Sequence, residues 1–387
     1  MSAPTVERRR ETSRRELLIG GTALFFAGRA HAQSKPRTLV VVFLRGGVDG
    51  LAMVPPTDRG YEALRPTLRE DALKLDGSFG LHASMAPLLP LYESKRLAVL
   101  HAVGQQQPSR SHFDAQDFLE SGLAGAKASD GWLNRALAEL PAGGSAFRGV
   151  AVQNGVPFAM QGQEPIVAFP ALKDFRVGQS VAPSFEQLYA AAVDEALRVR
   201  GAEAFGSLEL VKGLRKAEPR NGAAYPKSPL GRRLQDVARM IHADVGLRIA
   251  ATESGGFDTH LGQKQALAPR LEELAEGLAA FAADLGPRLD DVCVLTVTEF
   301  GRTAQENGTR GTDHGTASAM LALGGGVKGG RVVADWPGLE RAQLHEGRDL
   351  RVTLDVRAVL AEALTQHLEV PSERALPGVK PARVLFG

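Results

Sequence analysis

Residues 38–44, Thr-Leu-Val-Val-Val-Phe-Leu, form an uninterrupted apolar run that is rich in β-branched side chains. Pro36 precedes the run and Gly46-Gly47 follows it, so turn-forming residues bound a segment of strand length. A strand with one solvent-exposed face alternates apolar and polar residues. A continuously apolar strand is instead covered on both faces, as in a mainly parallel sheet. The run therefore predicts the first central strand of an α/β fold.

Further apolar runs follow, separated by segments with helical periodicity. Strands are expected at residues 96–103, 149–152, 247–251, 292–297 and 319–323. Helices are expected at residues 86–93, 230–242, 263–285 and 354–368. The longest of them, 263–285, carries leucines three and four positions apart, which places them on one buried face. Strands alternating with helices predict a three-layer α/β/α sandwich with a mainly parallel central sheet.

The first 32 residues have the features of a twin-arginine signal peptide. Arg14 and Arg15 precede an apolar stretch at 17–27, and Ala30-His31-Ala32 forms a small-residue cleavage motif. This stretch is shorter than the roughly 20 residues that span a bilayer, so a membrane anchor is not expected. We expect the Tat translocon to export the chain, and the mature protein to work in the periplasm or outside the cell without a membrane span.

Charge and cysteine content limit the partners and the stabilising chemistry. Residues 1–32 hold six arginines and three glutamates, a net charge of +3, whereas the whole chain carries +2, so the remainder is close to −1. This balance gives no basic groove for nucleic acid. Cys293 is the single cysteine, which excludes an internal disulfide. Residues 33–387 are long enough for one large domain, in which an Ala- and Leu-rich part around 180–240 predicts a helical insertion.

Polar residues collect where the predicted strands end, which is where ligands bind in open α/β sheets. Asp49 follows the first strand in the turn RGGVDG, either as a ligand at the sheet edge or as part of an ordinary Asp-Gly turn. Glu253, Asp258 and His260 follow the strand at 247–251. Two carboxylates and an imidazole at this spacing favour a divalent metal, either zinc or a hard cation such as magnesium, calcium or manganese.

The last third of the chain adds three candidate metal ligands. Glu299 follows the strand at 292–297 directly, in the sequence TEFGRT. Asp313 and His314 precede the strand at 319–323 and are flanked by glycines. This pair is either a set of ligands that point inward from a turn or part of a surface loop with a structural histidine.

Residues 108–114, Pro-Ser-Arg-Ser-His-Phe-Asp, follow the second predicted strand and open a helix. Ser111 and Asp114 have the spacing of a capping box, which is sufficient to explain them. The same position suits a nucleophile, because unpaired N–H groups at a helix N-terminus stabilise an alkoxide or a bound oxyanion. Arg110 could clamp two oxygens of a phosphate or sulfate. Ser109 is the alternative nucleophile.

With these motifs, the chain resembles the typically Tat-exported family called domain of unknown function 1501. The motifs that carry the resemblance occur in the order FLRGGVDGL, PSRSHFDAQ, SDGWLNRAL, GGFDTH, TEFGRT and TDHG. They span essentially the whole mature chain. The family is grouped with the alkaline phosphatase and sulfatase superfamily, so the resemblance implies an alkaline-phosphatase-like α/β/α sandwich.

The resemblance also implies roles for individual residues. In the superfamily the first strand ends in a metal-binding Asp, which Asp49 matches, and the nucleophile opens a helix after a later strand, which Ser111 or Ser109 matches. Gln106 stands where sulfatases carry a modifiable Cys, which argues against formylglycine chemistry.

The remaining superfamily ligands map onto the later motifs. Glu253 precedes Asp258 by five residues, as in alkaline phosphatases, and His260 follows two residues after that Asp rather than four. His314 corresponds to the superfamily's final metal-binding His. Glu299 takes the place of an Asp-His pair.

Two functions are compatible with these observations. The first is a secreted, metal-dependent hydrolase that acts on a small phosphoric or sulfuric ester, with the metal activating Ser111. The second is a non-catalytic protein that keeps the fold and binds or assembles an envelope component. The presence of Asp49, Asp258, His260 and His314 favours the hydrolase. The imidazole of the superfamily's Asp-His pair is absent where Glu299 stands, and this absence favours the second function.

Overall fold

Strand β1 (Thr38–Leu44) has the predicted bounds in the computed structural model of the chain, which describes residues 36–141, 145–174 and 213–386. The predicted signal peptide at 1–32 and most of the predicted insertion around 180–240 lie outside the described residues. The described residues belong to one compact unit. None of the helices in the described ranges combines the length and the apolar character needed to cross a membrane.

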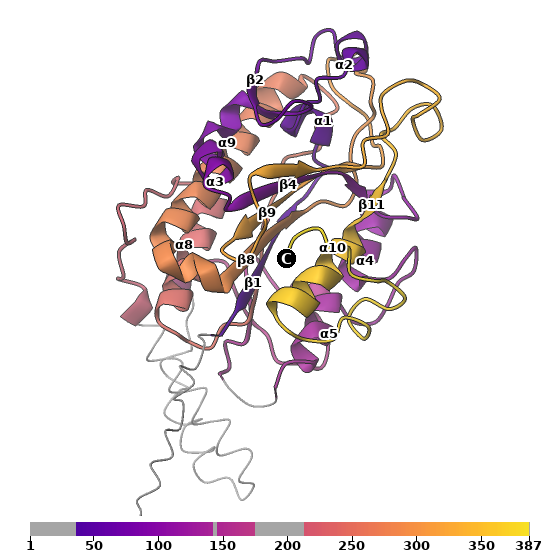
Figure 1. Cartoon of the computed structure of the whole chain (residues 1–387). Helices are drawn as coiled ribbons and strands as arrows, with labels where there is room; N and C mark the ends of the chain where they lie inside the picture. The colour runs from indigo at the N-terminus through magenta and orange to yellow at the C-terminus, as the bar shows by residue number, and fades with distance from the viewer. Residues whose placement is uncertain (1–35, 142–144, 175–212, 387) are drawn as a thin grey trace, which may run out of the picture. The chain divides into compact units, whose positions relative to one another are not determined.

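The main sheet has nine strands in the described part of the chain, in the order β10-β4-β9-β8-β1-β7-β5-β6, with β11 paired to β4 (Figure 1). Strand β1 lies near the middle, parallel to β7 on one side and to β8 on the other. The other strands are β4 (Leu97–Gly104), β5 (Gly149–Val152), β6 (Val167–Phe169), β7 (Ile249–Ser254), β8 (Val292–Val297), β9 (Ser318–Gly324), β10 (Arg331–Val333) and β11 (Leu354–Asp355).

Strand β9 runs antiparallel to both of its neighbours, β4 and β8. The beginning of β9 therefore lies at the edge of the sheet where the parallel strands end. As a result, the loop before β9 meets the loops that follow β1, β7 and β8. This reversal brings residues just before one strand next to residues just after three others.

Helices cover both faces of the sheet (Figure 1). One face is covered by a 3-10 helix at Ala83–Leu88 together with α3 (Leu89–Glu93), α8 (Pro229–His242) and α9 (Gln263–Leu285). The opposite face is covered by α4 (His112–Ser121), α5 (Trp132–Ala138) and α10 (Val356–Glu362). The predicted three-layer α/β/α fold with a mainly parallel sheet is confirmed.

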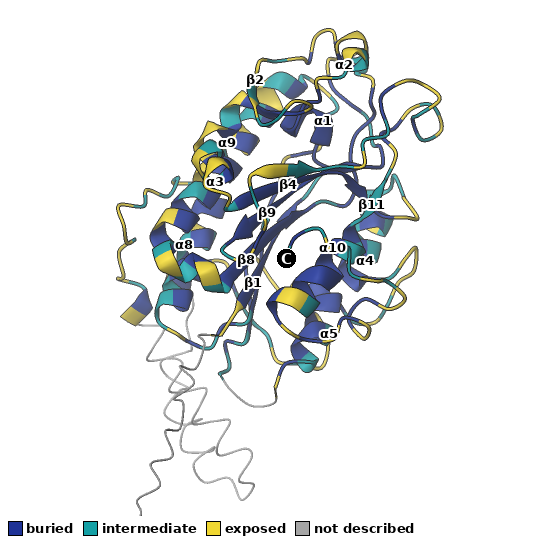
Figure 2. Cartoon of the chain, in the orientation of Figure 1, coloured by how far each residue is buried: buried dark blue, intermediate teal, exposed yellow. Residues whose placement is uncertain are grey.

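Strand β1 shows why its continuous apolar sequence is required. Its side chains alternate between two hydrophobic clusters, one on each face of the sheet, and the whole strand is buried (Figure 2). The first cluster takes Val40, Val42 and Leu44, and the second takes Leu39, Val41 and Phe43. A polar residue at any of these positions would be taken out of water without a partner, which is costly.

Smaller elements complete the fold around the sheet. Short helices α1 (Gly50–Met53) and α2 (Arg59–Leu64) follow β1, and β2 (Ala72–Lys74) pairs with β3 (Gly80–His82) in a separate antiparallel ribbon. The predicted closing helix at 354–368 begins instead as the two-residue strand β11 and ends in a π-helical turn at Ala363–His367.

Candidate metal centre

Four side chains from three loops converge at the carboxyl edge of the sheet. His112 is the first residue of α4, Asp258 and His260 follow β7, and His314 precedes the antiparallel strand β9. One ligand atom from each of His112, Asp258 and His314 lies within 4.8 Å of the other two. His260 joins them, since its Nε2 lies 2.9 Å from His314 Nε2 and 3.0 Å from Asp258 Oδ1.

The remaining separations complete the outline of a metal site. His314 Nε2 lies 3.2 Å from Asp258 Oδ1, and His112 Nε2 lies 3.5 Å from Asp258 Oδ2. Donor atoms bound to tetrahedral zinc at about 2.0–2.1 Å lie about 3.3 Å from one another. His112, Asp258 and His314 therefore lie close enough together to hold one ion, and His260 lies beside two of them.

Each histidine is held from behind by a hydrogen-bond acceptor on Nδ1. The acceptors are Glu299 Oε1 for His112 at 2.8 Å, Asp313 Oδ1 for His260 at 3.1 Å, and the Arg110 carbonyl for His314 at 2.8 Å. Ionised carboxylates and carbonyls only accept, so each Nδ1 is the donor and each Nε2 faces the centre of the cluster. Metal-binding histidines are held in this way in proteins.

The Nε2 atoms face the centre of the cluster. His112 Nε2 is buried and has no hydrogen-bond partner within the described ranges. The Nε2 atoms of His260 and His314 lie 2.9 Å apart, close enough to share one proton or one metal ion. Buried polar atoms without a partner are rare in native proteins. A divalent ion would satisfy all three nitrogens at once.

The electrostatics of the site also suit a cation. Burial opposes ionisation of Asp258, but a 2.5 Å hydrogen bond from Arg302 and the charge of that guanidinium, with help from His314 and His260, lower the pKa of Asp258 to about 2. Burial lowers the pKa of His314. Near neutral pH the site therefore presents an ionised carboxylate and a neutral His314 imidazole, the protonation states that bind metals.

Two of the predicted ligands lie behind the histidines. The buried carboxylate of Glu299 accepts hydrogen bonds from His112 Nδ1, from Gly46 N at 2.9 Å and from Gln116 Nε2 at 2.9 Å. Asp313 contacts His260 Nδ1 and accepts a 3.1 Å hydrogen bond from Asn307. The geometry places both carboxylates where they orient histidines instead of where they would bind the ion.

Asp49 and Glu253 are not brought into the cluster. The buried Asp49 carboxylate caps α1, forms an ion pair with Arg65 and accepts a 2.5 Å hydrogen bond from Gln263. The carboxylate of Glu253 accepts a 2.6 Å hydrogen bond from Arg45 Nε. Since other groups already engage these oxygens, we do not place Asp49 or Glu253 among the ligands.

The predicted catalytic residues lie next to the cluster along the chain. Ser111 caps α4 through a long 3.5 Å hydrogen bond from Asp114 N, and Ser109 Oγ accepts from Ser111 N at 3.1 Å. The guanidinium of Arg110 pairs with Asp349 at 2.6 Å and with Glu346 at 2.7 Å. Arg110 therefore contributes its carbonyl to the site, and its side chain would have to leave Asp349 to clamp a substrate.

His112 lies within the motif PSRSHFDAQ and was not among the residues predicted to bind a metal. Two signals could have identified it. The residue follows a predicted strand, as the other candidates do, and histidine is the commonest metal ligand among side chains.

Sequence comparison assigns the chain to a family. The family described as "Protein of unknown function (DUF1501)" matches residues 36–376, so the chain belongs to it. The resemblance stated from the motifs is thereby confirmed. A search of curated proteins finds no match.

Solved structures similar to the chain share little sequence with it. The PsFucS1 sulfatase from Pseudoalteromonas sp. is 12% identical, with 90% of this chain and 74% of that chain covered and a TM-score of 0.39. The phosphonate monoester hydrolase of Agrobacterium radiobacter is 9% identical, with 90% and 78% covered and a TM-score of 0.36. The alkaline phosphatase from the Antarctic bacterium TAB5 is 8% identical, with 77% and 95% covered and a TM-score of 0.31. Likeness at this level does not define a function.

Proposed function

We propose that this member of the DUF1501 family is a metal-dependent hydrolase of phosphoric or sulfuric esters. The observation that supports it most is the meeting of three imidazole Nε2 atoms and the Asp258 carboxylate, with every Nδ1 held by an acceptor. His112, Asp258, His260 and His314 are the ligands in this proposal. Three nitrogens and one oxygen favour zinc over magnesium or calcium, which prefer oxygen donors.

The chain's own residues provide the setting for this chemistry. A bound divalent ion supplies Lewis acidity toward an anionic ester oxygen. Asp258 contributes one negative charge against the two positive charges of the ion, so the site stays attractive to an anionic substrate. Ser111, which directly precedes His112, brings a hydroxyl to the N-terminus of the ten-residue helix α4. Its long capping bond leaves that hydroxyl weakly engaged.

Replacing Ser111 with alanine is expected to lower kcat at least about 100-fold and to leave metal content intact. The assay is hydrolysis of 4-nitrophenyl phosphate and 4-nitrophenyl sulfate with zinc, magnesium, calcium or manganese. Ser109→Ala, made in parallel, decides between the two candidate nucleophiles. If Ser111→Ala keeps full turnover and loses only about 0.5–2 kcal/mol of stability, Ser111 is a helix cap and no more.

A non-catalytic role in the envelope is the competing proposal. It draws on the Arg110 guanidinium, which is already paired with Asp349 and Glu346 and so is not free for an ester. It also draws on the number of possible metal sites, because the part of the chain that the structure describes contains one such cluster of ligands. Metal-loaded protein that hydrolyses no ester with any of the four ions would favour this role.

We further propose that the Tat translocon exports the chain, because Arg14 and Arg15 precede a short apolar stretch. Replacing both arginines with lysine is expected to leave uncut precursor in the cytoplasm, since lysine keeps the charge but loses the guanidinium pair. Immunoblots of cytoplasmic and periplasmic fractions measure this. Normal processing of the variant, or normal export in a strain without the translocon, would contradict the proposal.

A further inference from the structure

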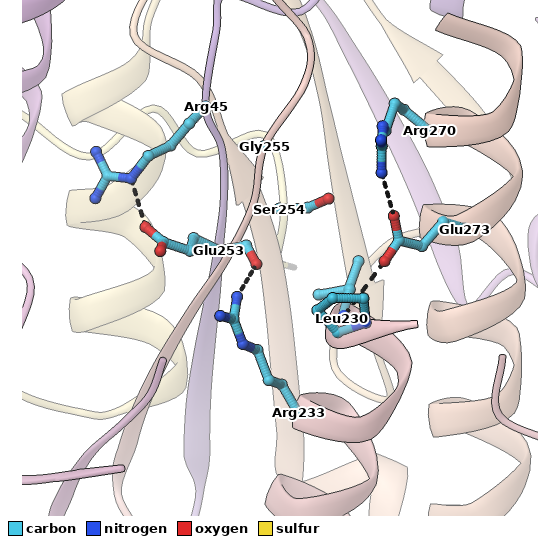
Figure 3. A pocket seen from close by; sticks show the side chains of 9 residues that line it. Arg45, Leu230, Arg233, Glu253, Ser254, Gly255, Arg270 and Glu273 are labelled. Carbon is cyan, nitrogen blue, oxygen red and sulfur yellow. Dashed lines mark hydrogen bonds and ion pairs between the residues drawn. The ribbon is translucent and has the colours of Figure 1, made fainter. Parts of the chain in front are cut away.

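A cavity of about 260 Å³ lies beside the carboxyl end of β7, and none of the four proposed metal ligands lines it. Its charged lining consists of three arginines and two glutamates: Arg45, Arg233, Glu253, Arg270 and Glu273 (Figure 3). Pockets that enclose whole small molecules have volumes of roughly 300–1,000 Å³. The cavity is below that range, so its size suits one charged group of a larger ligand.

Arg233, in the first turns of α8, has unused binding capacity. Its Nη1 donates a 2.7 Å hydrogen bond to the Glu253 carbonyl, and within the described residues no carboxylate forms an ion pair with it. A guanidinium has five N–H donors, so most of its donors remain unengaged. Burial lowers the pKa of Arg233 even though Glu253 and Glu273 act in the opposite direction. A half-buried cation without an ion pair gains most from an anion.

The other lining charges are unequally engaged. Arg45 is already paired with two carboxylates, because it donates to Glu253 at 2.6 Å and to Glu120 at 2.8 Å, and it also donates to Gln116 at 2.8 Å. The ion pair with Arg45 also engages the Glu253 carboxylate, which is then less able to neutralise Arg233. Arg270 is held weakly, by one 3.4 Å contact with Glu273, and 47% of its side chain is exposed. The two available cations of the cavity are therefore Arg233 and Arg270, and Figure 3 shows them on opposite sides of it.

The loop that lines the cavity leads along the chain to the metal centre. Gly255 lines the cavity, and Asp258 follows three residues later on the same loop. Gly256 packs so tightly against Arg270 that an added Cβ would lie 2.8 Å from Arg270 Nε. On the other side, a hydrogen-bond chain runs from Arg45 through Gln116 and Glu299 to His112.

We infer that this cavity binds a tetrahedral oxyanion, a phosphate or sulfate group, held between the guanidinium groups of Arg233 and Arg270. Guanidinium groups bind such anions through paired, charge-assisted hydrogen bonds. The anion is the second charged group of the substrate whose ester lies at the metal centre, and this part of the inference rests on the proposed function. The preferred substrates are then esters with two separate anionic groups.

The first test measures anion binding without catalysis. Thermal unfolding of the mature protein is followed with increasing sodium sulfate or sodium phosphate against sodium chloride at equal ionic strength. A bound anion raises Tm with its concentration. Arg233→Gln is expected to weaken the anion roughly tenfold or more, whereas Arg232→Gln, its exposed neighbour on the same helix, keeps the wild-type response.

Two further variants keep the test decisive. Arg233→Lys keeps the positive charge but loses the paired N–H donors of the guanidinium. The folded variant is therefore expected to show a rise of Tm with sulfate between those of the wild type and Arg233→Gln. His314→Ala separates anion binding at the metal centre from binding in the cavity, and its sulfate response should survive. If sulfate raises the Tm of Arg233→Gln as much as that of the wild type, the inference is overturned. The inference is also overturned if His314→Ala is the only variant in which sulfate no longer raises Tm.

The second test measures substrate preference. For an ester with a second phosphate or sulfate group, Arg233→Gln is expected to raise KM roughly tenfold, with little change for 4-nitrophenyl phosphate. Equal effects on both substrates overturn the role in substrate binding. If no ester is hydrolysed, the proposed function fails, and the sulfate titration still decides whether the cavity binds an anion.

Discussion

Replacing His112 with alanine is expected to lower metal affinity more than 100-fold and to abolish ester hydrolysis in a protein that remains folded. Mutations of the groups that only orient metal ligands typically cost 10–100-fold in metal affinity, so loss of a ligand itself should cost more. His112 lies at the start of α4 and is partly exposed, so alanine leaves the core intact. Elemental analysis and a competitive chelator titration of the purified protein measure the affinity.

Two matched variants sharpen this result. Phe113→Ala changes the next residue, whose side chain is 84% exposed, and should leave metal affinity unchanged. Glu299→Gln keeps the size of the side chain behind His112 but removes its charge, and should weaken the metal by about 10–100-fold. Wild-type metal content in His112→Ala would remove this residue from the site and leave its buried Nε2 without an explanation.

Replacing Asp49 with alanine is expected to destabilise the protein by about 3–5 kcal/mol and to leave the metal stoichiometry of the folded fraction unchanged. The Arg65 side chain is fully buried, and the carboxylate of Asp49 is its ion-pair partner. Removing Asp49 leaves a charge in the core without compensation, and Arg65 keeps only its hydrogen bonds to the carbonyls of Ala304 and Thr303. Urea unfolding followed by circular dichroism measures the loss.

A double variant separates this effect from metal binding. Asp49→Leu combined with Arg65→Met removes both charges, and is expected to recover much of the lost stability because no buried charge is left alone. A metal ligand at position 49 predicts the opposite pattern. In that case Asp49→Ala would lose the metal with a small change in stability, and the double variant would not recover it.

The sheet could be predicted from sequence because its central strands are buried on both faces. The apolar runs at 38–44 and 292–297 define β1 and β8 with their observed bounds, and the leucine spacing defines α9 from Gln263 to Leu285. The direction of β9 could not be predicted. Parallel and antiparallel buried strands have the same apolar pattern, and direction depends on which strands lie beside it in the fold.

The candidate site was partly accessible from sequence for a related reason. The position of a strand end indicates which side chains reach the edge of the sheet, and Asp258 and His260 were found in this way. His314 was found from its place between glycines just before the strand at 319–323. Sequence does not show which carboxylates another side chain has already engaged. Arg65 pairs with Asp49 across 16 positions, and Arg45 donates to Glu253 across 208. Only the folded arrangement shows that these carboxylates already have partners.

The position of β1 in the sheet has a consequence for synthesis of the chain on the ribosome. Leu39 pairs with Ile249 and Thr38 with Val292, so the neighbours of this early strand follow it in the sequence by 210 and 254 positions. Contacts between such distant segments make folding slow. Until they form, the nascent chain carries a bare apolar strand with two open edges, which is a template for aggregation. Both edges of residues 38–44 can therefore be paired only after residue 297 has been made.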